Sequence, residues 1–381
     1  MSIKSTREIL ADLVAFDTTS INSNLPLIDY VRDYLAGLGV AAEIFLNQSG
    51  DKANLWATIG PSGPGGLILS GHTDCVPVEG QAWTSDPFAL TERNGQLYGR
   101  GACDMKGFLA SALASVPSLA SARLKQPVHL AFSYDEEIGC TGVREMIDRL
   151  AARGEKPAGC LVGEPTLMRV IVGHKGGRAY RVWFTGSEAH SSLAPRAVNA
   201  VELAAEFVVF LRSVAHDLAL GPADDDYDVV HSTISTGSIH GGGAVNIVPK
   251  HCSVTFEFRH LPEIDPESIF TRISAFAADK LLPAMRSREP ESGIVFEPVY
   301  EYPAFNIDPS HPLVTRIKAI VAHNDHSKVA FGTEAGLFQQ GLGVPTVVCG
   351  PGSIDVAHKP DEFVSQDQLD RCDLALRKLL L

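Results

Sequence analysis

Residues 66–74 read Gly-Leu-Ile-Leu-Ser-Gly-His-Thr-Asp, and this stretch decides the class of fold. Its apolar run, residues 66–70, shows no polar alternation, which is typical of a strand buried on both faces. Residues 128–133 and 160–162 are short runs of the same kind, and residues 105–116 read as a helix rich in Ala and Leu. Buried strands that alternate with helices predict an α/β fold with a mostly parallel sheet covered on both sides.

The two ends of the chain share this pattern. Near the start a helix is expected, which Asn24 can cap and in which Pro26 lies in the first turn. Near the end the pattern predicts a helix at 313–322, a strand at 344–349 and a helix at 366–380.

The pattern differs in the middle of the chain, after residue 176. Residues 252–259 alternate apolar and polar side chains, which predicts a half-exposed antiparallel strand. The segment is completed by a looser strand at 178–185, helices at 198–214 and 266–282, and a strand at 293–299. We therefore expect a catalytic domain formed by residues 1–175 and 301–381, with an α+β sandwich at 176–300 inserted as a lid and dimerisation domain.

Composition narrows the classes of function. The 381 residues include 32 basic and 45 acidic side chains, a net charge of −13, which argues against a general nucleic-acid binder. The seven cysteines are scattered without a C-x-x-C pair, so free thiols in a reducing compartment are the simplest interpretation. No apolar run approaches about 20 residues and the first residues do not resemble a signal peptide, so we expect a cytoplasmic protein without a membrane partner.

Five segments carry side chains that could perform chemistry, and four of them follow a predicted buried strand. Ligands bind beyond the carboxyl ends of parallel strands, so these side chains could converge at one edge of the sheet. Each acid could instead be a helix cap or a solvated loop residue. The segments are residues 70–74 (SGHTD), 99–107 (GRGACDMKG), 134–139 (YDEEIG), 163–166 (GEPT) and 357–362 (AHKPDE).

The converging set would contain two histidines and several carboxylates, a nitrogen and oxygen ligand set that suits zinc, cobalt or manganese. Two such ions activate water when one carboxylate bridges them. Of the adjacent pair Glu136 and Glu137, one could bind metal while the other acts as general base, although an exposed acidic turn is the alternative. Asp74 lies two residues after His72 and could orient its imidazole, or could be a simple turn residue.

Taken together, the five segments resemble the di-zinc metallopeptidase and deacylase family, and the resemblance covers essentially the whole chain. It implies that Asp104 bridges two metal ions, that Glu136 is the general base and that Asp74 supports His72. The implied metal ligands are His72, Asp104, Glu137, Glu164 and His358.

The resemblance also implies roles for residues of the inserted domain. His190 would stabilise the oxyanion, and its alternative is a plain loop histidine. Arg259 and Asn246 would hold the substrate carboxylate, although Arg259 could instead form a surface ion pair with Glu257 or Glu263. Residues 332–336 (GTEAG) would shape the pocket, with no role that physical argument assigns.

Residues 71–78, 132–140 and 349–355 are most similar to the branch of the family that deacetylates acetylornithine. The expected reaction is therefore hydrolysis of N2-acetyl-L-ornithine to L-ornithine and acetate, in arginine biosynthesis, with two divalent metal ions, zinc or cobalt. Another N-acyl-amino-acid deacylase, a succinyl-diaminopimelate desuccinylase or a dipeptidase is the alternative. A metal-free binding protein on the same scaffold is the alternative outside enzymes.

A homodimer is the expected assembly. The predicted strand at 252–259 belongs to a sheet whose edge needs cover, and pairing two such edges about a two-fold axis would supply it. In similar proteins that dimerise this way, the histidine that matches His190 serves the active site of the partner. The alternative is a monomer whose edge is guarded by the acidic loop at 224–226.

Overall fold

The computed structural model describes residues 3–381, and its contacts divide the chain into two compact units. The first unit contains the chain up to Gly173 together with residues 305–328 and 333–381. The second contains residues 174–304 and 329–332. The sequence pattern gives no sign of the short return of residues 329–332 to the second unit.

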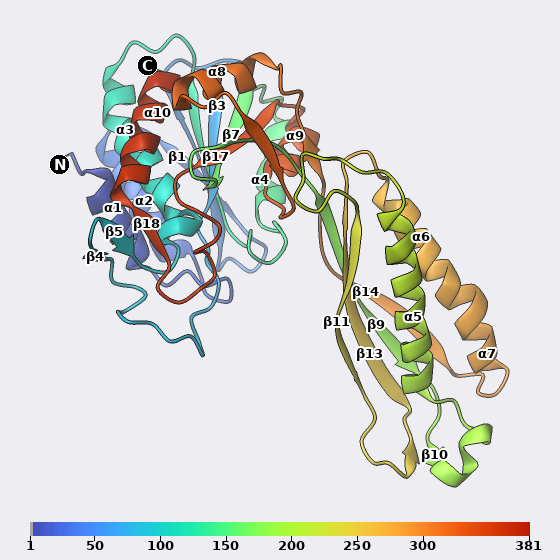
Figure 1. The fold of residues 1–381 in the computed structure, drawn as a ribbon. Helices are drawn as coiled ribbons and strands as arrows, with labels where there is room; N and C mark the ends of the chain where they lie inside the picture. Colours follow the sequence, from blue (N-terminus) through green and yellow to red (C-terminus); the bar gives the residue numbers. More distant parts are fainter. Residues whose placement is uncertain (1–2) are drawn as a thin grey trace. The chain divides into compact units, whose positions relative to one another are not determined.

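The first unit is built on a mixed nine-stranded sheet (Figure 1). Its central strands β6, β3, β7 and β17 are parallel neighbours, whereas β1–β2, β2–β6 and β17–β8 are antiparallel pairs. The expected α/β class is confirmed, with parallel pairing in the middle of the sheet. In spatial order the strands are β1 (Ala42–Leu46), β2 (Ala53–Ile59), β6 (Val128–Ser133), β3 (Leu67–His72), β7 (Gly159–Pro165), β17 (Thr346–Gly350), β8 (Val170–His174) and β15 (Phe305–Asn306), and β16 (His326–Val329) also pairs with β8.

Register brings the ends of the central strands to one edge of this sheet. His72 at the end of β3 pairs with Ser133 at the end of β6, and Ser70 pairs with Val162 of β7. The segment that follows Ser133 and the side chain of Glu164 therefore emerge beside His72. This edge is where ligands bind in sheets of this type.

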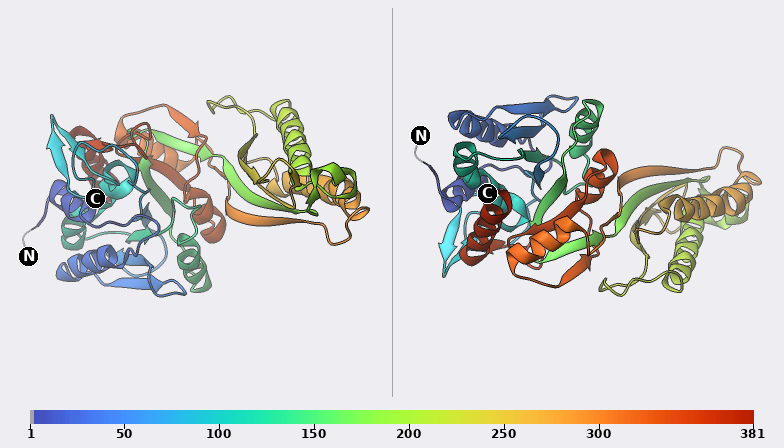
Figure 2. Two further views of the ribbon diagram at one scale, coloured as in Figure 1. Left: turned by 90° about the horizontal axis from the view of Figure 1, so that it is seen from below. Right: turned by 90° about the horizontal axis from the view of Figure 1, so that it is seen from above.

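Helices cover the sheet in two groups. Helix α3 packs against α1 and α10, and α10 packs against α8, whereas α4 packs against α9. The views in Figure 2 show these two groups on opposite sides of the sheet. The helices are α1 (Thr6–Val14), α2 (Leu25–Gly37), α3 (Gly107–Ser121), α4 (Val143–Ala152), α8 (Pro312–Val321), α9 (Ala335–Leu342) and α10 (Gln366–Leu380).

Two local expectations near the site are wrong in detail. The helix expected from residue 105 is preceded by an irregular turn, Ala102–Lys106, in which Asp104 has non-helical dihedral angles (φ −119°, ψ 94°). Asn24 is the N-cap residue of α2, as expected, but its side chain makes no capping hydrogen bond. Its buried side chain instead bonds the backbone of Ala53 and the hydroxyl of Thr73, which ties α2 to the sheet.

A small antiparallel sheet lies beside the carboxyl-terminal part of the first unit. It contains β4 (Thr91–Arg93), β5 (Gln96–Tyr98) and β18 (Phe363–Ser365), in the order β18-β5-β4. Phe363 pairs with Tyr98, so two segments more than 250 residues apart in sequence become neighbours.

The second unit is a four-stranded antiparallel sheet packed against helices. The strand expected at 252–259 is present as β13, and its alternate side chains Cys252, Val254, Phe256 and Phe258 are buried. Helix α5 packs against β11, β13 and β9. The elements are, in sheet order, β11 (Thr233–Gly241), β13 (His251–His260), β9 (Gly176–Thr185) and β14 (Gly293–Tyr302), the helices α5 (Ala200–Ala219), α6 (Pro266–Phe276) and α7 (Leu282–Arg286), and the short pair β10 (Ala189–His190) and β12 (Ile247–Val248).

All seven cysteines are buried and carry free thiols. Within residues 3–381, no helix combines the length and the apolar character that crossing a bilayer requires.

Candidate metal centre

Six of the side chains singled out in the sequence gather at the edge of the large sheet, within the first unit. They come from three strand ends and two irregular segments that the sheet brings together. They are His72 at the end of β3, Asp104 in the turn before α3, Glu136 and Glu137 after β6, Glu164 in β7, and His358 between β17 and β18.

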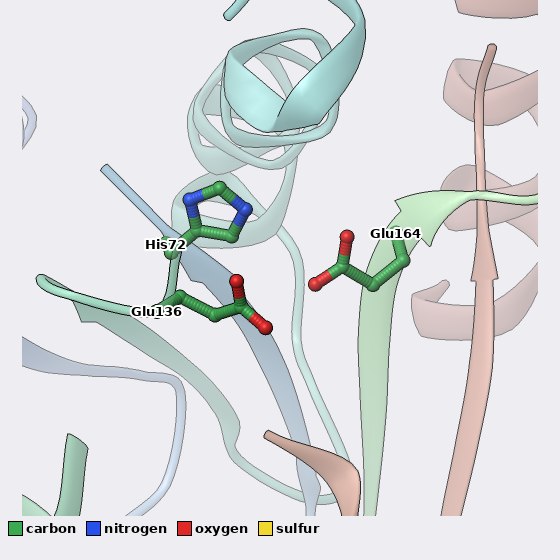
Figure 3. A group of neighbouring side chains, drawn as sticks. All are labelled: His72, Glu136 and Glu164. Carbon is green, nitrogen blue, oxygen red and sulfur yellow. The ribbon is translucent and has the colours of Figure 1, made fainter. Parts of the chain in front are cut away.

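Two overlapping groups of these side chains have the geometry of metal ligands. In the first, the ligand atoms of His72, Glu136 and Glu164 all lie within 4.8 Å of one another. Figure 3 shows the two carboxylates pointing toward each other and toward the imidazole. In the second, His72 is grouped with Asp104 and Glu137 by the same criterion.

Asp104 lies between the two histidines. Its Oδ1 is 3.1 Å from Nε2 of His72, and its Oδ2 is 3.3 Å from Nε2 of His358. The same His358 nitrogen is 3.0 Å from Oε2 of Glu137. Each oxygen of one carboxylate thus faces a different histidine, which is the arrangement that a carboxylate bridging two ions requires.

The charges of this cluster are unbalanced. Burial raises the pKa of Glu164 well above its usual range, and the nearby Asp104 and Glu136 raise it further. Burial likewise raises the pKa of Glu137 to about 7. Hydrogen bonds to Asp104 and Glu137 raise the pKa of His358 to about 10.

A divalent cation would satisfy this excess of buried negative charge. Glu164 is only 4% exposed and its Oε1 has no hydrogen-bond partner among the described residues. Buried carboxylates are otherwise paired or bound to metal. The oxygen and imidazole donors suit zinc or a similar ion. The residues therefore fit the metal centre that the sequence predicts.

Asp74 contacts the segment that carries Glu136 and Glu137 as well as His72. The Nδ1 of His72 lies 2.9 Å from the backbone carbonyl of Asp74 and 3.5 Å from its carboxylate. The Asp74 carboxylate accepts hydrogen bonds from the backbone N–H groups of Glu136 (3.1 Å) and Glu137 (3.3 Å). The hydroxyl of Ser20 donates a further bond of 2.7 Å to Asp74.

Sequence reasoning missed a second support of this segment. Asp135 has a positive φ of 55°, directly before Glu136. Its carboxylate forms a largely buried ion pair of 2.6 Å with Lys52, which follows a turn between β1 and β2. The Asp-Glu-Glu run marks the segment, but no local pattern points to Lys52, which is 83 residues away.

Two buried carboxylates of the quoted segments also lack an assigned role. Glu334 is 1% exposed and accepts a 3.1 Å hydrogen bond from the hydroxyl of Ser70, two residues before His72. Glu362, also 1% exposed, faces the backbone of the turn that holds Asp104. Their place in the quoted segments was the only signal that the sequence offered.

The remaining candidates belong to the second unit. His190 pairs with Ile247, and the N–H of Ser191 donates to the carbonyl of Asn246, so His190 and Asn246 are neighbours. Both are exposed. Arg259 forms the ion pair with Glu257 that was its alternative, at 3.4 Å, and also donates to the carbonyl of Ala330.

A parallel-centred sheet whose strand ends carry a buried cluster of histidines and carboxylates is the arrangement of a metal-dependent hydrolase. Residues 68–381 match Peptidase family M20/M25/M40, and the chain belongs to this family. It is 35% identical to an acetylornithine deacetylase of Myxococcus xanthus, over 99% of this chain and 97% of that protein. An acetylornithine deacetylase of Pasteurella multocida is also 35% identical, with 94% and 91% of the two chains covered.

Solved structures share the fold. A metallo-carboxypeptidase of the M20 family from Sulfolobus solfataricus has a TM-score of 0.80 at 20% identity, covering 99% of this chain and 98% of that one. A dinuclear metal-binding peptidase of the M20 family from Bacillus subtilis has a TM-score of 0.67 at 15% identity, covering 98% and 96%. At these identities the likeness concerns the fold.

Proposed function

We propose that this chain hydrolyses N2-acetyl-L-ornithine to L-ornithine and acetate, a step of arginine biosynthesis. The names of its relatives, acetylornithine deacetylases at 33–35% identity over most of the chain, support this substrate. The observation that carries the proposal is the cluster in which the buried carboxylate of Asp104 contacts both His72 and His358.

In this proposal the cluster would bind two divalent ions, zinc or cobalt. His72 and Glu164 would hold one, Glu137 and His358 would hold the other, and Asp104 would serve both. When bound, such ions polarise the amide carbonyl and make the attacking water more acidic.

Glu136 is the proposed general base. It accepts a proton from the water that attacks the acetyl carbonyl, and it gives that proton to the amine nitrogen as the C–N bond breaks. Burial raises the pKa of Glu136 well above its usual range, although His72 opposes this effect. A carboxyl group with such a pKa can hold the proton between the two steps.

The second unit has the proposed role of a lid and dimerisation domain, and the first unit that of the catalytic domain. His190 donates a hydrogen bond to the oxyanion, while Arg259 and Asn246 hold the substrate carboxylate. The protein is a homodimer in this proposal. Seven free buried thiols support a cytoplasmic location.

Metal removal tests the proposal. We expect dialysis against a chelator to abolish hydrolysis of acetylornithine, and added zinc or cobalt to restore it. Released ornithine should be compared with the products from acetylmethionine, succinyl-diaminopimelate and a dipeptide. Full activity after exhaustive metal removal would overturn the metallohydrolase assignment, and faster turnover of another substrate would replace acetylornithine as the substrate.

A further inference from the structure

We infer that Glu362 is a positioning residue that fixes Asp104 and His358, the two ligands from irregular segments, in the geometry that metal binding needs. This inference rests on the proposed metal-dependent function, and it adds a residue to which no role has been assigned. It is argued entirely within the first unit.

The Glu362 carboxylate is an internal anion held by the turn before α3. Its Oε1 accepts hydrogen bonds from the backbone N–H groups of Cys103 (2.8 Å) and Asp104 (3.0 Å). Its Oε2 accepts from the N–H of Gly101 (3.2 Å) and from Nη1 of Arg100 (2.7 Å). Successive backbone N–H groups that converge in this way form an anion-binding concavity, so the carboxylate fixes the path of this irregular turn.

The fold places Glu362 there by register. Strand β18 pairs with β5 so that Phe363 lies opposite Tyr98. The N–H of Gly99 donates a 3.0 Å hydrogen bond to the carbonyl of Glu362, which extends the pairing by one step. The side chain therefore reaches the segment that runs from β5 to Asp104.

A second connection runs from Glu362 to His358. The fully buried guanidinium of Arg100 bonds both Glu362 and the side-chain oxygen of Gln81. The amide nitrogen of Gln81 then donates a 3.1 Å hydrogen bond to the carbonyl of His358. The ring of Trp83 lies 5.0 Å from the Arg100 guanidinium and donates to Gln81 as well, which holds this connection in place.

The two ligands need such support for different reasons. Asp104 lies in a turn with non-helical dihedral angles, so no helix fixes its backbone. His358 has a positive φ of 62°, and its side chain is 49% exposed, so little packing fixes it. Outer partners that orient metal ligands are typically worth ~10–100-fold in metal affinity.

The substitution Glu362→Gln tests the inference. It keeps the shape but turns a donating amide group toward two of the N–H donors, so it should displace the turn. We expect zinc to bind ~10–100-fold more weakly, measured by competition with a chromophoric chelator. The visible absorption of the fully cobalt-loaded variant should also differ from that of the wild type, because the ligand geometry has changed.

The matched control is Asp373→Asn, which removes the charge of a partly buried carboxylate on α10 that bonds Thr6 and none of the proposed ligands. It should leave metal affinity and the cobalt spectrum unchanged, whatever its effect on the melting temperature. Wild-type affinity and spectrum for Glu362→Gln would overturn the inference. A wild-type protein that binds no metal would instead overturn the proposed function.

Gln81→Ala keeps the inference testable if Glu362→Gln does not fold. It removes the connection to His358, together with the hydrogen bonds that Gln81 accepts from Arg100 and Trp83, and it leaves the bonds between Glu362 and the turn in place. We expect one of the two zinc ions to bind several-fold more weakly and the other to be unaffected. Unchanged affinity at both sites would overturn the part of the inference that concerns His358.

Discussion

Glu136 and Glu137 are adjacent in sequence, and one pair of substitutions separates their proposed roles. Glu136→Gln should lower turnover of acetylornithine by at least ~100-fold, because the proton acceptor is lost, while metal content stays near that of the wild type. Glu137→Gln should instead reduce the number of bound metal ions. Steady-state rates and elemental analysis of the purified variants measure the two effects.

The same two variants also test the reverse assignment, in which Glu136 binds metal and Glu137 is the base. This assignment is worth testing because the carboxylate of Glu136 lies close enough to His72 and Glu164 to share a metal ion with them. If Glu136→Gln empties a metal site and Glu137→Gln leaves both ions bound, the roles are reversed. Thr141→Ala, a change at an exposed position in the same loop, is a control for general damage.

Glu334 provides a prediction about pH and stability. Burial raises its pKa from 4.5 to about 7 in the folded chain. Because the pKa of Glu334 is higher in the folded chain than in the unfolded chain, its contribution to the free energy of unfolding falls as pH rises above 4.5. The fall levels off above pH 7. Glu334→Gln removes this titration, so the variant should gain stability over the wild type as pH rises, by roughly 3 kcal/mol in total.

The measurement is the free energy of urea unfolding of metal-free protein at pH 5 and pH 8. The difference between Glu334→Gln and wild type should be larger at pH 8. Glu202→Gln, at an exposed position in α5, changes the net charge equally and should show little dependence. If Glu334→Gln differs from the wild type by the same free energy at both pH values, the pKa of Glu334 is not raised by burial in the folded chain.

Strand ends and a glycine-rich turn that the local sequence marks predicted that most of the proposed ligands would converge, whereas their roles as ligands came from the family resemblance and stay a prediction. The contacts that hold these side chains in place could not be predicted from the sequence. Lys52 meets Asp135 across 83 residues, and Glu362 meets Asp104 across 258 residues. Asp74 contacts His72, and its carboxylate also accepts hydrogen bonds from the backbone of Glu136 and Glu137, which no local sequence pattern indicates. Such contacts depend on strand order and register, which one sequence does not reveal.

At the scale of elements, Gly163 sets the distance between β7 and α3. A Cβ added at Gly163 would lie 1.9 Å from Cγ of Phe108, so the helix must shift. Overpacking of this kind typically costs about 1–3 kcal/mol. We expect Gly163→Ala to destabilise the protein by at least this amount and to weaken metal binding, because Glu164 is the next residue on the strand.

Gly293→Ala is the matched control at the start of β14, where an added Cβ meets nothing within 4 Å. It should be neutral or stabilising by up to about 1 kcal/mol. Chemical denaturation and metal titration of both variants give the comparison. Equal stability of the two alanine variants would mean that α3 can move away from β7 without penalty.

Helices and strands with a clear pattern of apolar side chains could be predicted from the sequence. Those that mix apolar and polar side chains without such a pattern could not. The run at 128–133 is β6 and the helix expected at 366–380 is α10. Strand β11, with the sequence TISTGSIHG, has too few apolar side chains to stand out, because much of it remains exposed. The helix expected from residue 105 begins at Gly107, and the preceding turn Ala102–Lys106 donates backbone hydrogen bonds to the distant Glu362 carboxylate, which no local pattern reveals.

At the scale of the whole molecule, the change from uniformly apolar strands to alternating ones revealed an insertion, because only sheets covered on one face alternate. The second unit exposes an edge, since β11 is the outermost strand of its sheet. Ile239 on this strand is 46% exposed and Val209 on the adjacent α5 is 65% exposed. Apolar side chains beside an unpaired strand edge support the proposed two-fold pairing of second units.

Subunit mixing tests both this dimer and the proposed role of His190. His190→Ala and Glu136→Gln should each be nearly inactive alone, since one lacks an oxyanion donor and the other lacks the base. If His190 serves the active site of the partner subunit, one site of each heterodimer regains both groups. An equimolar mixture after exchange should then recover about a quarter of wild-type activity, because half of the dimers are mixed and each has one complete site.

Subunit exchange must be confirmed independently, for example with a tag on one variant. Light scattering should give the mass of a dimer for the wild type. Restored activity cannot arise within either chain alone, because each retains its own defect. A monomeric mass, or no recovery of activity after confirmed exchange, would reject the shared site and restrict His190 to its own chain. A monomeric mass would also leave the exposed edge of β11 without the proposed partner.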